Sequence, residues 1–312
     1  MFYFILRMII LTSMLYLVFA GVCFGAIGVF VKGIGASIST ILLVSIRLIS
    51  TALLIVTYEG FRGKLGQLRL NSAREFGIGM VGGLIGFALT FSLYLKSLLI
   101  IPVSKAVFLH YVAFPLSTIV YSALVLKERV TKYEVVALIG AFVGVILIYN
   151  VAIFSPSGSG SLVGYTMAFA SGITYSAVIL GLKSFARTKT TLQTLFWPAL
   201  FGGVGLIPVV LFDGVKFDVS GGTLFNLMGL VLFSTALGYS LFARGLQDVR
   251  AGVSSIILII VEPAAAVVMA VIFLGENVTG YSLAGGALIV LAGAFIYLGR
   301  TRSPGGEGVV EG

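Results

Sequence analysis

The chain of 312 residues contains 59% hydrophobic and only 10% charged residues, a composition that excludes an ordinary soluble globular protein. Its single cysteine excludes an intramolecular disulfide and a cysteine-based zinc site, and its single histidine excludes a multi-histidine metal site. A net charge of +9 would suggest a nucleic-acid partner in a soluble chain, but here the basic residues fall between apolar segments. We therefore expect a polytopic membrane protein without a cofactor, a metal ion or a nucleic-acid partner.

Ten apolar segments are each close to the length of about twenty residues that a helix needs to cross the hydrocarbon core of a bilayer. The first one follows Arg7 and is longer than the core of a secretory signal peptide, so we interpret it as a retained membrane helix; Met8 and Met14 are alternative starts. The sequence predicts an all-α membrane protein with ten transmembrane helices, at residues 10–31, 38–57, 76–95, 103–125, 132–150, 161–182, 192–212, 223–242, 252–274 and 281–299.

The basic residues are distributed unevenly between the predicted loops. Four lie on the side opposite the N-terminus, at Lys32, Lys96, Lys105 and Lys216, and Arg47 lies within a predicted helix. The other fifteen lie on the side of the N-terminus, at Arg7, Arg62, Lys64, Arg69, Arg74, Lys127, Arg129, Lys132, Lys183, Arg187, Lys189, Arg244, Arg250, Arg300 and Arg302. Cytoplasmic loops carry an excess of basic residues. We therefore expect a protein of the cell membrane with both termini in the cytoplasm.

The two halves of the chain repeat each other. Pro115 and Pro263 are 148 residues apart, and a glutamate follows each of them thirteen residues later, at Glu128 and Glu276. Each half contains five predicted helices, an odd number, so the halves must have opposite orientations in the membrane. Inverted repeats are typical of secondary transporters, whose substrate site lies near the bilayer midplane between the repeats. We predict five-helix repeats over 10–150 and 161–300, an external linker over 151–160 and a disordered cytoplasmic tail over 301–312.

Glu262 lies near the middle of the ninth predicted helix, directly before Pro263. An ionisable residue at this depth is costly and by default indicates a functional site. Pro263 has no N–H, so the carbonyl of Ile259 loses its usual helical partner. Glu262 could exchange a proton or bind a substrate cation. Alternatively, it is a structural carboxyl beside the proline or forms a buried ion pair with Arg47, whose guanidinium keeps its charge and needs a partner or water.

Aromatic and hydroxyl side chains form a second group of candidates. His110 can change its charge near neutral pH, or it can be a hydrogen-bonded core residue. Tyr111 points to the neighbouring face of the same helix, so we expect only one of the two to reach a cavity. A wall for an amphipathic solute is one interpretation of the group, and core packing is the other. The predicted substrate-binding residues are Phe24, Thr90, Tyr94, His110, Tyr111, Tyr175, Tyr239 and Glu262.

One pattern occurs once in each half. Tyr94-Leu-Lys96-Ser-Leu98 and Phe242-Ala-Arg244-Gly-Leu246 are each followed by a helix with a central proline and then by Glu-x-Val-Thr. With ten helices in two halves, the chain resembles the EamA-like transporters of the drug/metabolite transporter superfamily. The resemblance implies a carrier whose cavity is lined by helices 1, 3, 4, 6, 8 and 9, with helix 2 on the scaffold side.

The resemblance also bears on substrates. Members of the family move amino acids, other metabolites or drugs, often outward, and many carry a glutamate before the proline of helix 9, as Glu262 does here. The chain departs from the family at Phe114, where many members have a polar or acidic residue, and at Phe24-Gly25, where many have Trp-Gly.

We predict a secondary transporter that exports amino acids or related small metabolites, the direction being the one that the resemblance implies, through alternating access of the two halves. Glu262, Arg47 and His110 are the candidates for proton coupling or an ion pair. A passive facilitator of the same fold is the alternative. An intramembrane enzyme lacks support, because the predicted helices contain no paired acids and no supported Ser/His/Asp set, so no catalytic residue is predicted. The expected partners are a small solute, the lipid bilayer and protons, and the sequence is compatible with a monomer.

Overall fold

The computed structural model describes residues 2–124, 132–149, 159–185, 191–218, 220–245 and 251–301. In these residues the chain is almost entirely helical, and the extended pairing is an isolated bridge between Ile38 and Phe217. Within the described part, six helical stretches are long and apolar enough to cross a membrane: Leu11–Ile34, Thr40–Phe61, Ala73–Ile100, Thr194–Phe212, Gly221–Phe242 and Ile257–Leu274. The predicted fold class, an all-α membrane protein, is confirmed.

In the residues that the structure describes, each of the ten predicted apolar segments contains helical structure. The first half contains α1 (Phe2–Gly25), α2 (Ile27–Ile34), α3 (Thr40–Phe61), the short 3₁₀-helix η1 (Leu65–Leu68), α4 (Ala73–Val81), η2 (Gly82–Leu89), α5 (Thr90–Ile100), α6 (Val103–Leu124) and α7 (Lys132–Tyr149). The second half contains α8 (Ser159–Phe185), α9 (Thr191–Gly205), α10 (Ile207–Asp213), α11 (Gly221–Met228), η3 (Gly229–Leu237), α12 (Gly238–Gly245), α13 (Ala251–Leu274) and α14 (Gly280–Thr301). Most of the predicted linker and tail, and Glu128, lie outside the described residues.

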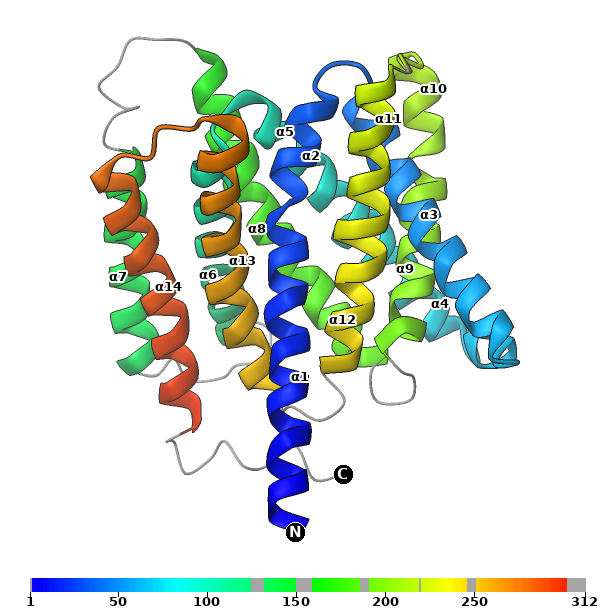
Figure 1. The fold of residues 1–312 in the computed structure, drawn as a ribbon, viewed down its shortest axis with the longest axis horizontal. Coiled ribbons are helices and arrows are strands. Elements are labelled where there is room, and N and C mark those ends of the chain that lie inside the picture. Colours follow the sequence, from blue (N-terminus) through cyan, green and yellow to red (C-terminus); the bar gives the residue numbers. More distant parts are fainter. Residues whose placement is uncertain are drawn as a thin grey trace.

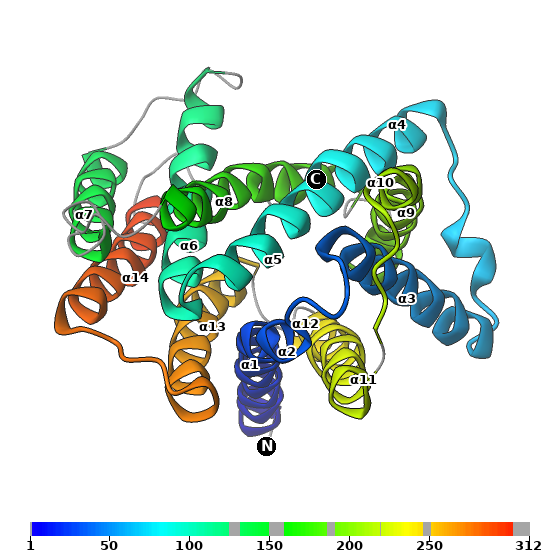
Figure 2. The same cartoon turned by 90° about the horizontal axis from the view of Figure 1, so that it is seen from above.

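The contacts between helices follow a paired pattern. α1 packs on α13 and α12, and α8, its counterpart in the other half, packs on α6 and α5. α7 and α14 lie side by side at one edge of the molecule, and α3 contacts α9 toward the opposite edge (Figures 1 and 2). Two related halves would produce such corresponding helix contacts. The boundaries of the repeats stay a prediction.

Glycines allow the inner helices to approach closely. Gly21 and Gly25 of α1 lie against α13, where an added Cβ at Gly25 would be 2.8 Å from the backbone nitrogen of Ala266. Gly172 of α8 lies against α6 in the same way, with the carbonyl of His110 as its neighbour. Small residues permit this approach because they leave room for the backbone of the partner helix. The glycines therefore place α1 beside Glu262 and α8 beside His110.

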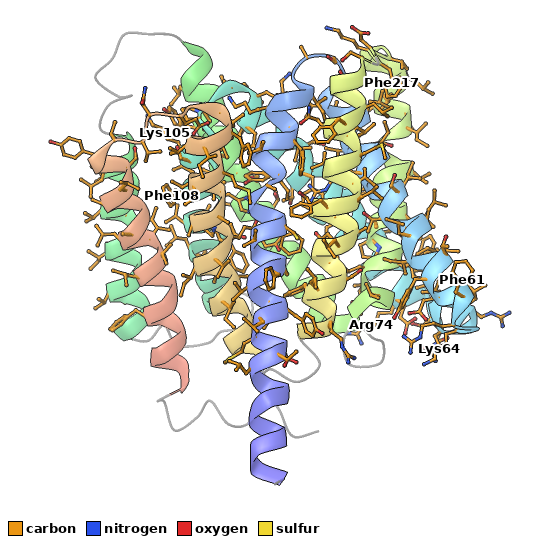
Figure 3. The ribbon with its side chains drawn as sticks, viewed as in Figure 1. Phe61, Lys64, Arg74, Lys105, Phe108 and Phe217 are labelled. Atoms are coloured by element: carbon orange, nitrogen blue, oxygen red, sulfur yellow. The ribbon has the colours of Figure 1, made fainter. Side chains whose placement is uncertain are left out.

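The two ends of the molecule carry different residues. Lys64 and Arg74 lie at the end where α1 begins and α14 finishes, whereas Lys105 and Phe217 lie at the opposite end (Figure 3). This arrangement separates Lys64 and Arg74 from Lys105, as the loop distribution does. Which end faces the cytoplasm stays a prediction.

Candidate functional site

Two π-helical segments lie in the third and eighth predicted spans. η2 covers Gly82–Leu89 and η3 covers Gly229–Leu237, so each occupies the central part of its span. A π-helix replaces the usual hydrogen bond to residue i−4 with one to i−5, and such segments occur frequently at functional sites. η2 ends immediately before Thr90, and η3 contains Thr235. The π-helices therefore set the direction of two hydroxyl groups in the middle of the molecule.

Arg47 of α3 is buried between these segments, with 2% of its side chain exposed. Its Nε donates to Thr235 Oγ1 at 3.0 Å, and its guanidinium lies over the ring of Phe91, 4.7 Å from the centroid. Thr235 Oγ1 donates in turn to the carbonyl of Leu230 at 2.9 Å. Nη1 of Arg47 has no hydrogen-bond partner in the described part of the chain. A buried guanidinium with an unused donor is costly, which makes it a candidate for binding an anionic group.

Glu262 of α13 approaches Arg47 from the other half of the chain. Its carboxylate is hydrogen-bonded to the hydroxyl of Tyr111 on α6 and interacts electrostatically with Arg47. The side chain is only half-buried, although it lies near the middle of its helix. α13 continues as a helix through Pro263. A carboxylate, a phenol and a guanidinium from three helices thus lie near one another at the middle of the bundle.

His110 connects α6 to α8 and α5. Its Nδ1 lies 2.8 Å from Ser171 Oγ, and Ser171 donates its only hydroxyl hydrogen to the carbonyl of Ala168 at 2.6 Å. Nδ1 must therefore be the donor, and the neutral ring presents Nε2 as an acceptor; this tautomer is assigned from the hydrogen bonds. The ring of His110 lies 4.7 Å from that of Tyr94 and 5.2 Å from that of Tyr175.

The remaining candidates extend this group. Thr90 Oγ1 donates to Thr174 Oγ1 at 2.7 Å, beside Tyr175 on α8. Phe24 of α1 packs on Tyr239 of α12, with ring centroids 5.0 Å apart, and Tyr94, Tyr175 and Tyr239 lie near Arg47. We call these residues the central cluster: Phe24, Arg47, Thr90, Tyr94, His110, Tyr111, Tyr175, Tyr239 and Glu262.

The structure adds to two expectations about this cluster, and which of its residues reach a cavity stays a prediction. His110 and Tyr111 both contact it, because α6 lies between α8 on one side and α13 on the other, so two neighbouring faces of the helix are used. Arg47 belongs to it as well, although the family resemblance places helix 2 on the scaffold side. α3 lies close enough to η3 and α5 for the long arginine side chain to reach inward.

Several contacting residues were not among the predicted ones, among them Phe91, Ser171, Thr174 and Thr235. Ser171 had a detectable signal, because Ser171 and Tyr175 are spaced i, i+4 and therefore share a helical face. Phe91 had none, since a phenylalanine within an apolar segment is expected in any membrane helix.

A groove with a volume of about 320 Å³ lies elsewhere, between α3 and α10. It is lined mainly by aliphatic side chains and contains no residue of the central cluster: its lining residues are Leu42, Ser45, Ile46, Ile49, Ser50, Ile207 and Val210. We therefore do not identify it with the candidate site.

Comparison with known proteins decides the family. The sequence profile of the EamA-like transporter family matches residues 11–150 and 162–298. The chain belongs to the EamA-like transporter family. The two matched ranges lie on either side of the predicted linker, and together they contain every residue of the central cluster.

Several relatives of this EamA-like chain carry transporter names. The uncharacterized inner membrane transporter YicL of Salmonella typhimurium is 28% identical over 300 residues, which cover 93% of this chain and 96% of the relative. The uncharacterized transporter YyaM of Bacillus subtilis is 26% identical over 257 residues, 81% of each chain. Protein PecM of Dickeya dadantii is 28% identical over 185 residues, 57% of this chain and 59% of PecM. The chain is therefore a membrane transporter of the EamA type.

A solved crystal structure shares the fold. It superposes with a TM-score of 0.64 over 94% of this chain and 99% of the other chain, at 19% sequence identity. At this identity, the likeness supports the fold alone.

Proposed function

We propose that this EamA-like protein is a secondary transporter of small solutes that carry a carboxylate and an amine, such as amino acids and related metabolites. The observation that carries the proposal is the placement of Arg47 and Glu262, which come from different halves and lie in one cluster. Both halves must contribute to a site that faces the two sides of the membrane in turn. In this proposal, the two halves alternate around the central cluster.

The chemistry of the cluster suits such a solute. The unused Nη1 donor of Arg47 would bind a carboxylate, and Glu262 would bind an ammonium group or exchange a proton for it. The rings of Tyr94, Tyr175 and Tyr239 would contact the apolar part of the solute, and their hydroxyls offer further hydrogen bonds. A charged group in a low-dielectric site needs a partner, which favours solutes with complementary charges.

Proton coupling through Glu262 is part of the proposal. Among the described helices that form the central cluster, Glu262 is the only acidic residue near the middle of a helix, and Tyr111 holds its carboxylate toward α6. A proton and the amine of the solute would then compete for the carboxylate of Glu262. Because only one of them can occupy it at a time, the transport of the solute would be coupled to the transport of the proton. We further propose that the protein lies in the cell membrane with both termini in the cytoplasm, in keeping with the basic loops and with the name of its relative YicL, an inner membrane transporter. Export is the direction that we propose for its solute.

The test is uphill transport in proteoliposomes. Purified protein should concentrate at least one labelled amino acid or related metabolite when a pH difference is imposed, and collapse of that difference by a protonophore should abolish the accumulation. Equilibration without accumulation would favour the passive facilitator. No flux of any member of a broad panel of such solutes, from protein shown to be folded, would contradict the proposed substrate class.

A further inference from the structure

The N-terminus of α6 lacks a capping side chain in its own sequence. α6 begins at Val103, and the preceding Pro102 has no side-chain hydrogen-bond acceptor and no backbone N–H. The carbonyl of Pro102 already accepts from the N–H of Ala106 at 3.0 Å. The first N–H groups of a helix have no partner within the helix, so another group must satisfy them. In α6 these groups belong to Val103 and Ser104, which are both buried.

Glu276 satisfies them from the other half of the chain. Its Oε1 accepts from the N–H of Val103 at 2.6 Å, and its Oε2 accepts from the N–H of Ser104 at 3.2 Å and from Ser104 Oγ at 3.1 Å. Hydrogen bonds to a carboxylate are stronger than those between neutral groups, and a negative charge is favourable at a helix N-terminus. One side chain therefore holds the start of α6 through three hydrogen bonds.

The backbone of Glu276 is fixed to the end of α13. Gly275 adopts a φ of 64°, a left-handed conformation that ends a helix, and the N–H of Glu276 donates to the carbonyl of Ala270 at 3.2 Å. The carboxylate must therefore move together with α13. Lys105, the residue after Ser104, lies at the end of the molecule opposite Lys64 and Arg74 (Figure 3).

α6 and α13 are thus connected at two levels, by Tyr111 and Glu262 in the central cluster and by Glu276 at the Lys105 end. We propose that Glu276 is a latch that keeps the Lys105 end of the transporter closed, and that its hydrogen bonds to α6 break when this end opens. The inference rests on the proposed alternation of the two halves. Glu276 is a positioning residue here, because it acts on the two helices and touches no solute.

Side-specific cysteine labelling tests the latch. Cys23→Ala removes the only cysteine, and Val107→Cys places a reporter thiol one turn into α6, at a side chain that is 1% exposed. Glu276→Gln keeps the size of the side chain but removes its charge. We expect Glu276→Gln to increase the rate at which a membrane-impermeant maleimide labels this α6 reporter about tenfold when the reagent is added from the Lys105 side. Ser104→Ala removes one of the three bonds and should give a smaller increase.

A matched control is available in α4. Glu75 lies in the first turn of α4, where its carboxylate accepts from the N–H of Asn71 at 2.8 Å, just before the helix begins. Glu75→Gln removes the same charge at the start of a different helix, so it should leave the labelling of the α6 reporter unchanged.

Two results would overturn the latch. A second reporter, Ala52→Cys, is buried in α3, and an equal increase at both reporters in Glu276→Gln would indicate general loosening. Unchanged labelling of the α6 reporter in a folded, transporting Glu276→Gln protein would show that the contact is a static cap. Unchanged labelling would contradict the latch but not the proposed transport function. Absence of solute flux in the unmodified protein would contradict the transport function but not the hydrogen bonds of Glu276 to α6.

Discussion

At the scale of single residues, the charged side chains of the central cluster have few hydrogen-bond partners. Arg47 uses Nε for Thr235 and has an unused Nη1, while Glu262 is hydrogen-bonded to Tyr111 rather than to Arg47. The two charges therefore attract each other across the cluster without a direct hydrogen bond. A solute with both charges would satisfy the two groups together, which a neutral solute could not do.

Arg47→Lys keeps the positive charge but loses the planar donor array that contacts Thr235 and Phe91. We expect the KM for a transported amino acid to rise about tenfold or more, because the ammonium cannot bond Thr235 and the carboxylate in the planar geometry of the guanidinium. The measurement is initial uptake into proteoliposomes, with the amide of the same amino acid as the comparison solute. An equal rise for the acid and its amide would show that Arg47 does not bind the carboxylate.

Glu262→Gln keeps the shape of the side chain and its ability to bond Tyr111, but removes its proton exchange. We expect the variant to bind solute and to fail to concentrate it, with the pH dependence of transport lost. Uptake at several imposed pH differences, together with solute binding to the folded protein, provides the measurement. Uphill transport with an unchanged pH dependence would assign Glu262 a structural role beside Pro263.

At the scale of helices, glycine contacts decide how closely α6 and α8 approach. An added Cβ at Gly172 would meet the carbonyl of His110 and the Cβ of Ala113, neither of which is the end of a flexible side chain. We expect Gly172→Ala to destabilise the folded protein by about 1–3 kcal/mol, the usual cost of overpacking, and to disturb the rings around His110. Thermal unfolding in detergent measures the effect.

Gly77→Ala is the matched control for this prediction. No atom of the described residues lies within 4 Å of an added Cβ at Gly77, and alanine favours a helix more than glycine does. The control should therefore be neutral or slightly stabilising, and a comparable loss of stability at both positions would contradict the proposed role of the α6–α8 contact.

At the scale of the whole molecule, the two ends can be told apart by charge and tested directly. In a Cys23→Ala background, Lys64→Cys and Lys216→Cys introduce thiols at exposed positions, and Lys64 lies at the end opposite Phe217, the neighbour of Lys216 (Figure 3). The excess of basic residues around Lys64 predicts that this end is cytoplasmic. In intact cells, an impermeant maleimide should therefore label the Lys216→Cys protein and leave the Lys64→Cys protein unlabelled until the membrane is opened. Labelling of the Lys64→Cys protein alone would reverse the predicted orientation.

Much of the fold was predictable because its causes are local in sequence. Apolar segments of suitable length became helices, and glycines spaced four apart, such as Gly21 and Gly25, met a partner helix. Glu262 stood out because a charge is rare at that depth. The hydrogen bond from Nε of Arg47 to Thr235 was not predictable, since it depends on how closely α3 approaches η3. The cap on α6 was also hidden, because Glu276 is 173 residues away from Val103.

The π-helices η2 and η3 have a genetic consequence. A π-helical segment accommodates an extra residue that an α-helix of the same length would not hold. Deleting one codon within Gly82–Leu89 would let the segment become α-helical while Thr90 and Tyr94 keep their neighbours, because the deletion removes the extra residue. The same deletion in an α-helical segment would rotate everything after it by about 100°. We therefore expect the protein to tolerate a single-codon deletion in these two segments better than one in the α-helices that flank them.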